Sequence, residues 1–148
     1  MVNIEKVLFP TDFSVNSDFV LEYAMSLSKK YGARMYILHV VDETIDIAEF
    51  YVPHMRIDKI DKEMLDGAEK IMDDFCKKHL CGFNDFETII RFGLPHAEIL
   101  KSADENGVDA IVMGTHGRTG INRVFFGSVA EKVVKKSSRP VLTVKMPE

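Results

Sequence analysis

The chain has 148 residues, of which 46% are hydrophobic and 28% are charged, and its formal net charge is −4. This length fits one domain over residues 1–148, and the acidic balance argues against a general nucleic-acid binder. No apolar run approaches the roughly 18 residues that a membrane span requires. Two cysteines, Cys76 and Cys81, are too few for a disulfide framework or a zinc site. These features favour a soluble protein of the reducing cytoplasm.

Short apolar segments alternate with longer amphipathic segments along the chain. The first predicted strand, Lys6 to Pro10, precedes a helix that Ser14 or Ser17 can cap and that Gly32 ends. A second strand follows from Arg34 to Val41. The apolar face expected for the first helix consists of Phe19, Val20, Tyr23, Ala24 and Leu27.

A less regular stretch from Asp42 to about His54 separates the second strand from a long helix that stops before Gly82. The apolar residues that predict this helix recur at spacings of three and four: Ile57, Ile60, Met64, Ala68, Ile71 and Phe75. The remaining elements are a strand over 86–92, a helix over 95–106 between Pro95 and Gly107, a strand over 110–113, a helix from Ser128 with Ala130 and Val134 on one side, and a strand over 140–145.

Five strands joined by helical crossovers predict an α/β fold. The expected architecture is a single open, doubly wound, five-stranded parallel sheet with helices on both faces, which is Rossmann-like. Ligands of such sheets bind beyond the carboxyl ends of the strands, near the point where the strand order reverses. Three segments should therefore meet at one edge: Pro10 to Asp12, Val40 to Asp42, and Gly114 to Gly117.

The segment from Gly114 to Ser128 reads GTHGRTGINRVFFGS and leads from the fourth strand into the last helix. Glycines let the backbone approach a bulky anion, and the first turn of a helix offers unpaired N–H groups with a partial positive charge. Gly114 and Gly117 would permit a tight turn, and Gly127 with the N–H groups of Ser128 and Val129 would hold phosphate oxygens. This arrangement favours a nucleotide. The alternative is a set of ordinary loop glycines followed by Ser128 as an N-cap.

The spacing of the glycines resembles the phosphate-binding motif of the universal stress protein family, in its ATP-binding branch. The motif is G-x-x-G, followed by nine residues and then by Gly127 and Ser128. Three further segments extend the resemblance over nearly the whole chain: FPTDFS from Phe9, LHVV from Leu38 and SRPVLTV from Ser138. The resemblance implies a cytoplasmic stress-response protein that binds ATP, with AMP or ADP as alternatives. It also implies a nucleotide-dependent switch acting through an unidentified partner.

The resemblance assigns roles at the expected edge. Asp12 stands where the family has an acidic residue near the nucleoside, and a carboxylate there could accept hydrogen bonds from ribose hydroxyls or help hold Mg²⁺ or Mn²⁺ with the nucleotide. The alternative for Asp12 is a helix-flanking cap shared with Ser14. Val40 and Val41 stand where the family binds adenine, with backbone groups contacting the edge of the base. The candidate nucleotide-binding residues are Pro10, Thr11, Asp12, Val40, Val41, Met113, Gly114, Thr115, Gly117, Arg118, Gly127, Ser128 and Val129.

The basic side chains concentrate near the predicted phosphate site, since seven basic and two acidic residues lie from Arg118 onward. Arg118 and Arg123 could neutralise outer phosphates, although loop arginines are usually solvated. The alternative for Lys135, Lys136 and Arg139 is that they complement the C-terminal end of the last helix. His116 could donate to a phosphate or lie exposed, and His39 is expected to be a satisfied buried histidine. Neither histidine is assigned a catalytic role.

Three enzyme classes with a related sheet lack their motifs in this sequence. A Walker loop needs a lysine after its glycine, and both a dinucleotide fingerprint and an ATP pyrophosphatase need glycines after the first strand. No catalytic residue is therefore assigned. Two other functions stay open: a slow, metal-dependent ATP hydrolase, and a dimerisation or interaction module whose glycines are structural and whose docking surface is the stretch 42–54.

The last strand, over 140–145, is short and apolar and is expected at an edge of the sheet, where unpaired backbone groups invite a second chain. The resemblance implies a homodimer made in this way, whereas Pro140, Lys145 and Pro147 could instead protect the edge. Cys76 is expected to pack as a small apolar side chain. A redox switch between Cys76 and Cys81 would require the helix end to unwind.

Overall fold

The computed structural model describes residues 1–42, 60–116 and 127–147. Five strands form one parallel sheet in the order β3-β2-β1-β4-β5. The elements are β1 (Lys6–Pro10), α1 (Val15–Tyr31), β2 (Arg34–Asp42), α3 (Ile60–His79), β3 (Phe86–Gly93), α4 (Pro95–Asn106), β4 (Ala110–Gly114), α5 (Ser128–Lys136) and β5 (Val141–Val144). The predicted α/β class and the open, doubly wound parallel sheet are confirmed.

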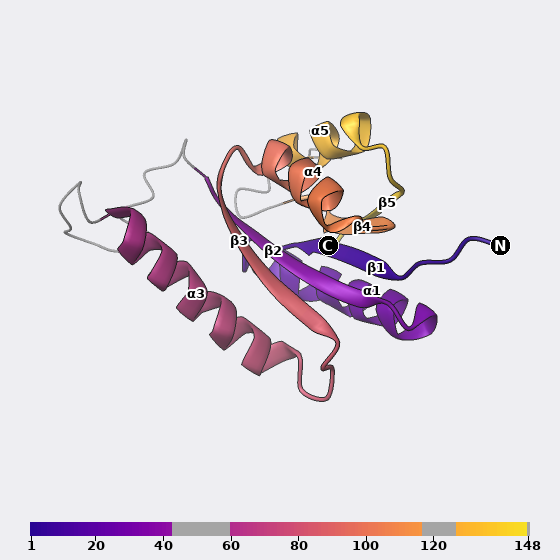
Figure 1. The fold of residues 1–148 in the computed structure, drawn as a ribbon, viewed down its shortest axis with the longest axis horizontal. Coiled ribbons are helices and arrows are strands. Elements are labelled where there is room, and N and C mark those ends of the chain that lie inside the picture. The colour runs from indigo at the N-terminus through magenta and orange to yellow at the C-terminus, as the bar shows by residue number, and fades with distance from the viewer. Residues whose placement is uncertain (43–59, 117–126, 148) are drawn as a thin grey trace.

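Helices cover both faces of the sheet (Figure 1). Side chains alternate between the two faces along a strand, so Val7 and Phe9 of β1 pack with α1 and α3, whereas Leu8 packs with α4 and α5. The strand order places β1 between β2 and β4. The chain leaves β1 in one direction, towards β2 and β3, and returns on the other side as β4, so the reversal point lies between β1 and β4.

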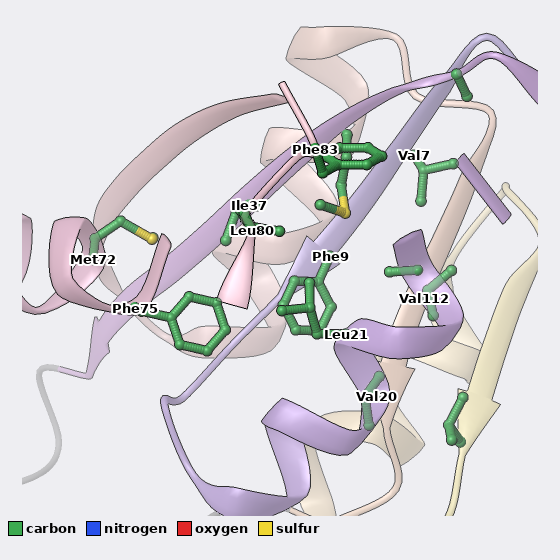
Figure 2. Packing of buried hydrophobic residues seen from close by; sticks show 14 residues of the cluster. Val7, Phe9, Val20, Leu21, Ile37, Met72, Phe75, Leu80, Phe83 and Val112 are labelled. Atoms are coloured by element: carbon green, nitrogen blue, oxygen red, sulfur yellow. The ribbon is translucent and has the colours of Figure 1, made fainter. Parts of the chain in front are cut away.

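The core on the side of α1 and α3 is centred on Phe9, whose side chain is 0% exposed. Its ring stacks on Phe75 of α3 with 6.5 Å between the ring centroids. In Figure 2, Leu21 from α1 and Phe75 from α3 lie near Phe9, and Met72 lies farther along α3. Burying one aromatic side chain of this kind stabilises the fold by roughly 2–3 kcal/mol. This packing fixes the strand whose carboxyl end enters the candidate site.

Helix α1 begins and ends at the predicted residues, but its buried face differs from the predicted one. Ser14 is the N-cap and accepts a hydrogen bond from the Ser17 N–H, and Gly32 ends the helix with a φ of 66°. The expected burial of Tyr23 is wrong, because its side chain is 46% exposed. The buried residues follow a helical stripe that includes small polar side chains: Ser17, Val20, Leu21, Ala24 and Ser28.

The later helices differ from prediction in smaller ways. Residues 43–59, and with them Ile57 and nearly all of the stretch expected to be irregular, lie outside the described residues. Asp42 is the last residue of β2. Met72 is buried at 1% exposure, a place the sequence pattern had given to Ile71, and Val134 of α5 is 44% exposed. In both helices the buried stripe is displaced from the predicted one.

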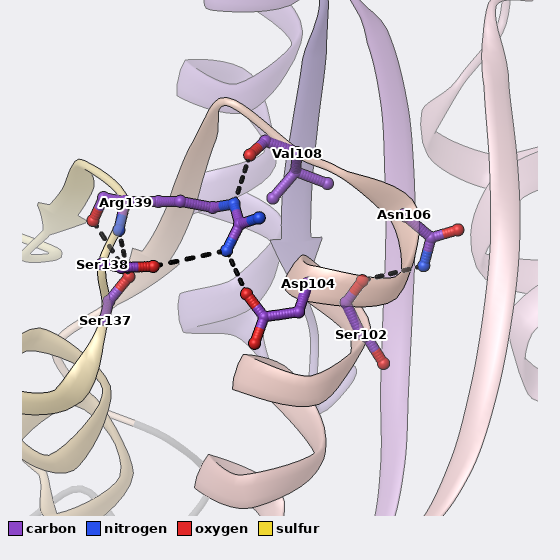
Figure 3. Close-up of polar contacts among 7 residues, drawn as sticks. All are labelled: Ser102, Asp104, Asn106, Val108, Ser137, Ser138 and Arg139. Carbon is purple, nitrogen blue, oxygen red and sulfur yellow. Dashed lines mark hydrogen bonds and ion pairs between the residues drawn. The ribbon is translucent and has the colours of Figure 1, made fainter.

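Arg139 joins α4 to the turn before β5, at the amino end of the sheet (Figure 3). Its Nε donates to the carbonyl of Val108 at 2.5 Å, and its guanidinium also pairs with the Asp104 carboxylate. The backbone N–H of Arg139 donates to Ser137 Oγ at 3.0 Å. The interpretation of Arg139 as a complement to the last helix is therefore wrong, since its guanidinium binds the C-terminal region of α4.

Replacing Arg139 with methionine is expected to lower the free energy of unfolding by about 1–3 kcal/mol. The substitution keeps the apolar stem but leaves the Val108 carbonyl without its charged donor. Urea unfolding followed by circular dichroism measures the change. The matched control is Lys135→Met, which removes an exposed ion pair with Glu131 and should change stability by less than about 1 kcal/mol. Equal effects in the two variants would contradict this account of Arg139.

Candidate functional site

The carboxyl ends of β1, β2 and β4 lie next to one another at one edge of the sheet. Pro10 is the last residue of β1 and pairs with Leu38, and the N–H of Thr11 donates to the Leu38 carbonyl at 2.8 Å. On the other side β1 pairs with β4 through Val7 with Ala110 and Leu8 with Ile111. The segments that follow Pro10, Leu38 and Ile111 are therefore neighbours, as the sequence predicted for the reversal point.

Gly127 connects the end of β4 to the start of α5. Its N–H donates to the Thr115 carbonyl at 2.6 Å, and a Cβ on Gly127 would lie 3.0 Å from that same oxygen. Its φ of −67° and ψ of 160° suit any residue, so space and not backbone conformation requires glycine. A larger residue here would push the helix away from the strand.

Among the residues that the structure describes, no side chain caps the N-terminus of α5. Gly127 is the N-cap, which corrects the reading of Ser128 as the capping residue: Ser128 is the first residue of the helix and is exposed. The first helical hydrogen bond is donated by the Glu131 N–H to the Gly127 carbonyl at 3.0 Å. The N–H groups of Ser128, Val129 and Ala130 precede that bond, so they and the positive end of the helix dipole can receive an anion.

Gly114 lies where the predicted tight turn begins, and the other glycine of that turn, Gly117, lies outside the described residues. Gly114 is the last residue of β4, where it pairs with Val144 of β5. A Cβ on Gly114 would lie 3.2 Å from Cγ2 of Val20 in α1, so glycine at this position lets α1 pack closely against the strand end. Arg118, another predicted member of this loop, also lies outside the described residues.

The turn from β1 into α1 is held by side-chain hydrogen bonds. Thr11 is 6% exposed, and its Oγ1 shares a 2.6 Å hydrogen bond with Ser17 Oγ and accepts the Phe13 N–H at 3.0 Å. Asp12 Oδ1 accepts the Ser14 N–H at 3.0 Å. The predicted helix-flanking role of Asp12 is thus present in the structure, and the half-buried carboxylate lies directly beyond β1.

Val40 and Val41 differ in what they present to this edge. Val41 is 0% exposed and packs with Met64 and Ala68 of α3, whereas Val40 is half-buried on the side of α4 and α5. The β1–β2 ladder ends at Leu38, while β2 continues to pair with β3 as far as Asp42. At Val41 the backbone, and not the side chain, is therefore what could contact a ligand at this edge.

Met113 and Thr115 complete the described part of the edge. Met113 is 5% and Thr115 6% exposed, and the Thr115 N–H donates to the Val144 carbonyl at 3.1 Å. Thr115 Oγ1 shares a 2.9 Å hydrogen bond with His116 Nδ1. Within residues 1–42, 60–116 and 127–147, no three His, Cys, Asp or Glu side chains gather closely enough to hold a metal ion.

Two features of this edge were missed by the sequence interpretation. Phe13 has a φ of 64°, a left-handed conformation that is uncommon for a bulky residue. His39 is buried, as predicted, but its Nδ1 lies 2.8 Å from the Thr11 carbonyl, which ties β2 to the turn. Neither could be found from the sequence, because a phenylalanine carries no signal for positive φ and the histidine contact spans 28 residues.

The two cysteines, both free, differ in their surroundings. Burial, with a smaller contribution from the Asp73 carboxylate, raises the pKa of the Cys76 thiol to about 11. Cys81 is exposed. At pH 8 a thiol with a pKa of 11 is a thiolate in roughly one molecule in a thousand, and the thiolate is the reactive form.

Iodoacetamide at pH 8 should therefore modify Cys81 much faster than Cys76 in the folded protein. Mass spectrometry of Cys76→Ser and Cys81→Ser variants measures the two rates separately, and unfolding in urea should bring the rates together. Comparable rates in the folded variants would contradict the assignment of Cys76 as a partly buried packing residue.

A model of the universal stress protein family matches residues 3–145. The chain belongs to the universal stress protein family. It is 35% identical to universal stress protein MJ0577 of Methanocaldococcus jannaschii, over 97% of this chain and 96% of that protein. It is 36% identical to universal stress protein YxiE of Bacillus subtilis, over 95% of this chain and 98% of that one. The solved structure of the MJ0577 protein covers 99% of both chains with a TM-score of 0.83.

More distant universal stress proteins share this fold. One, solved in complex with cAMP, is 24% identical with a TM-score of 0.63, over 97% of this chain and 98% of that chain. Another, from Archaeoglobus fulgidus and solved in complex with dAMP, is 21% identical with a TM-score of 0.66, over 98% and 100%. At these identities the likeness establishes the fold. Within the described residues, no helix combines the length and apolar character needed to cross a membrane.

Proposed function

We propose that this universal stress protein binds ATP at the carboxyl edge of the sheet, between the β1–α1 turn and the start of α5. The observation that carries the proposal is the N-terminus of α5, where the N-cap is a glycine, Gly127, whose backbone N–H holds the helix start against the end of β4. Three N–H groups at a helix start and a carboxylate at the same edge of the sheet suit the phosphates and the ribose of a nucleotide.

The candidate residues divide by the part of the nucleotide they would contact. The N–H groups of Ser128 and Val129 would bind phosphate oxygens, and the Asp12 carboxylate would accept hydrogen bonds from the ribose. The adenine would lie against Val40 and the backbone of Val41, within reach of Pro10, Thr11, Met113, Gly114 and Thr115. Gly117 and Arg118 keep their predicted role near the outer phosphates. Mg²⁺ or Mn²⁺ would enter with the nucleotide, and the Asp12 carboxylate would assist in binding the metal ion.

The relatives supply independent support for a nucleotide. Proteins with this fold have been solved with cAMP and with dAMP, and both ligands combine an adenine, a sugar and a phosphate. ATP is proposed over AMP or ADP because the start of α5, together with the predicted role of Arg118 and Arg123 at the outer phosphates, would accommodate more than one phosphate. The same site could serve a nucleotide-dependent switch that signals to a partner, in a reducing cytoplasm that suits the two free cysteines.

Calorimetric titration of nucleotide-stripped protein with ATP and magnesium, paired with an assay of phosphate release, separates the three candidate functions. The proposal expects saturable binding with negligible release. Metal-dependent phosphate release would favour the slow hydrolase. No binding and no release would overturn the ATP proposal and favour an interaction module whose glycines are structural. Parallel titrations with ADP and AMP rank the ligands.

We also propose that two copies of the chain pair along β5. The strand order places β5 at an edge of the sheet, and the apolar side chain of Leu142 in this strand is 44% exposed. Light scattering should give twice the chain mass for the wild type and the single chain mass for Leu142→Lys, since a charge on the joining strand opposes pairing. A monomeric wild type at micromolar concentration would overturn this proposal.

A further inference from the structure

We infer that His39 is a positioning residue that sets the orientation of Asp12 for the ribose. This inference rests on the proposed nucleotide site and adds a residue to which the sequence pattern gave no role beyond burial. His39 is 3% exposed on β2, and its ring lies beneath the turn that carries Asp12.

The peptide group between Thr11 and Asp12 is held by the ring of His39. His39 Nδ1 lies 2.8 Å from the Thr11 carbonyl oxygen. A carbonyl only accepts hydrogen bonds, so Nδ1 is the ring nitrogen that carries the proton. The same peptide plane contains the Asp12 N–H, because a peptide bond is planar. Through this hydrogen bond His39 fixes the plane from which the Asp12 side chain projects.

Phe13, the residue after Asp12, also contacts His39. Phe13 has a φ of 64°, a strained conformation that a bulky residue keeps only where its surroundings hold it. The Phe13 ring lies 4.4 Å from the His39 ring between centroids, and its N–H donates to Thr11 Oγ1 at 3.0 Å. His39 therefore contacts the residues on both sides of Asp12. Its N–H donates to the Thr11 carbonyl, and its ring packs against the ring of Phe13.

The N–H and the hydroxyl of Thr11 are held by hydrogen bonds that do not involve His39. Its N–H donates to the Leu38 carbonyl at 2.8 Å, and its hydroxyl is bonded to Ser17 at 2.6 Å. Removing the histidine N–H should thus leave β1 and α1 in place and free the peptide before Asp12, while the Asp12 carboxylate keeps its hydrogen bond from the Ser14 N–H. The expected consequence is a loss specific to the ribose contact and not a general loss of binding.

The experiment compares the affinity for ATP with that for 2′,3′-dideoxy-ATP, which lacks both ribose hydroxyls. In the wild type and in His39→Asn, ATP should bind about tenfold or more tightly than the dideoxy form, because hydrogen bonds to a carboxylate are of that strength. The asparagine amide N–H occupies the place of Nδ1. In His39→Gln and His39→Leu, whose side chains cannot donate from that place, the preference should disappear while dideoxy-ATP binds as in the wild type.

Each other outcome is decisive. If His39→Gln and His39→Leu still prefer ATP as the wild type does, the inference is overturned while the proposed nucleotide site stays intact. An equal loss of affinity for ATP and for dideoxy-ATP would also overturn it, because that result indicates a structural role for His39. Asp12→Asn, which weakens the acceptor directly, should also lose the preference, and its retention would contradict the ribose role of Asp12. If His39→Leu does not fold, the asparagine and glutamine variants alone give the comparison. Failure of the wild type to bind either nucleotide would overturn the proposed function itself.

Discussion

Replacing Phe9 with alanine is expected to lower the free energy of unfolding by about 3–5 kcal/mol. Phe9 is fully buried in the middle strand and packs between α1 and α3, so the truncated side chain would leave a cavity that the surrounding strands cannot close. Since a domain of this size has a total stability of about 5–15 kcal/mol, the variant should unfold at a much lower urea concentration. Equilibrium urea unfolding measures the difference.

Two control variants make the Phe9 prediction specific. Phe9→Leu retains most of the volume and should lose less than about 1.5 kcal/mol. Val15→Ala removes a 69% exposed side chain at the start of α1 and should change stability by no more than about 0.5 kcal/mol. A loss in Phe9→Ala as small as that in Val15→Ala would show that the packing around β1 is not as described.

Replacing Ser128 with glutamate is expected to weaken ATP binding tenfold or more while leaving the fold as stable as before or slightly more so. Ser128 is exposed in the first turn of α5, where a negative charge stabilises a helix by about 0.3–1 kcal/mol. The same charge would repel the phosphates that we propose to bind there. Opposite signs for stability and for affinity separate this prediction from simple damage to the protein.

Ser128→Gln is the matched control, because it has the size of glutamate without the charge. Calorimetric titration should give an affinity for ATP close to that of the wild type for the glutamine variant and a much weaker one for the glutamate variant. Equal weakening in both would indicate steric obstruction. Unchanged binding in both would place the phosphates elsewhere than at the start of α5.

Much of the fold followed from local sequence signals. Gly32 and Gly107 end their helices in left-handed conformations at the predicted residues, since glycine adopts that conformation readily. The alternation of strands and helices predicted the parallel sheet. The buried face of α1 did not follow in the same way: Tyr23 is exposed and the small side chain of Ser28 is buried, because proximity to the sheet, and not hydrophobicity alone, decides which residues are covered.

The candidate site was predicted in its location but not in its detail. The glycine pattern indicated a close approach of backbone segments, and Gly127 makes one, to the Thr115 carbonyl. The close neighbour of Gly114 is instead Val20, in a helix far away in the sequence. Contacts of this kind, like that of His39 with Thr11, depend on the register between strands, which no local pattern encodes.

The most direct test of the account is a titration of ¹⁵N-labelled, nucleotide-stripped protein with ATP, followed by amide spectra. The account predicts that the perturbed amides cluster at the carboxyl edge of the sheet, in residues 11–13, 40–42, 114–116 and 127–130. Amides at the opposite edge, including those of Ala33, Val108 and Arg139, should keep their positions. Perturbation centred on that opposite edge, or an unchanged spectrum at millimolar ATP, would contradict the proposed nucleotide site.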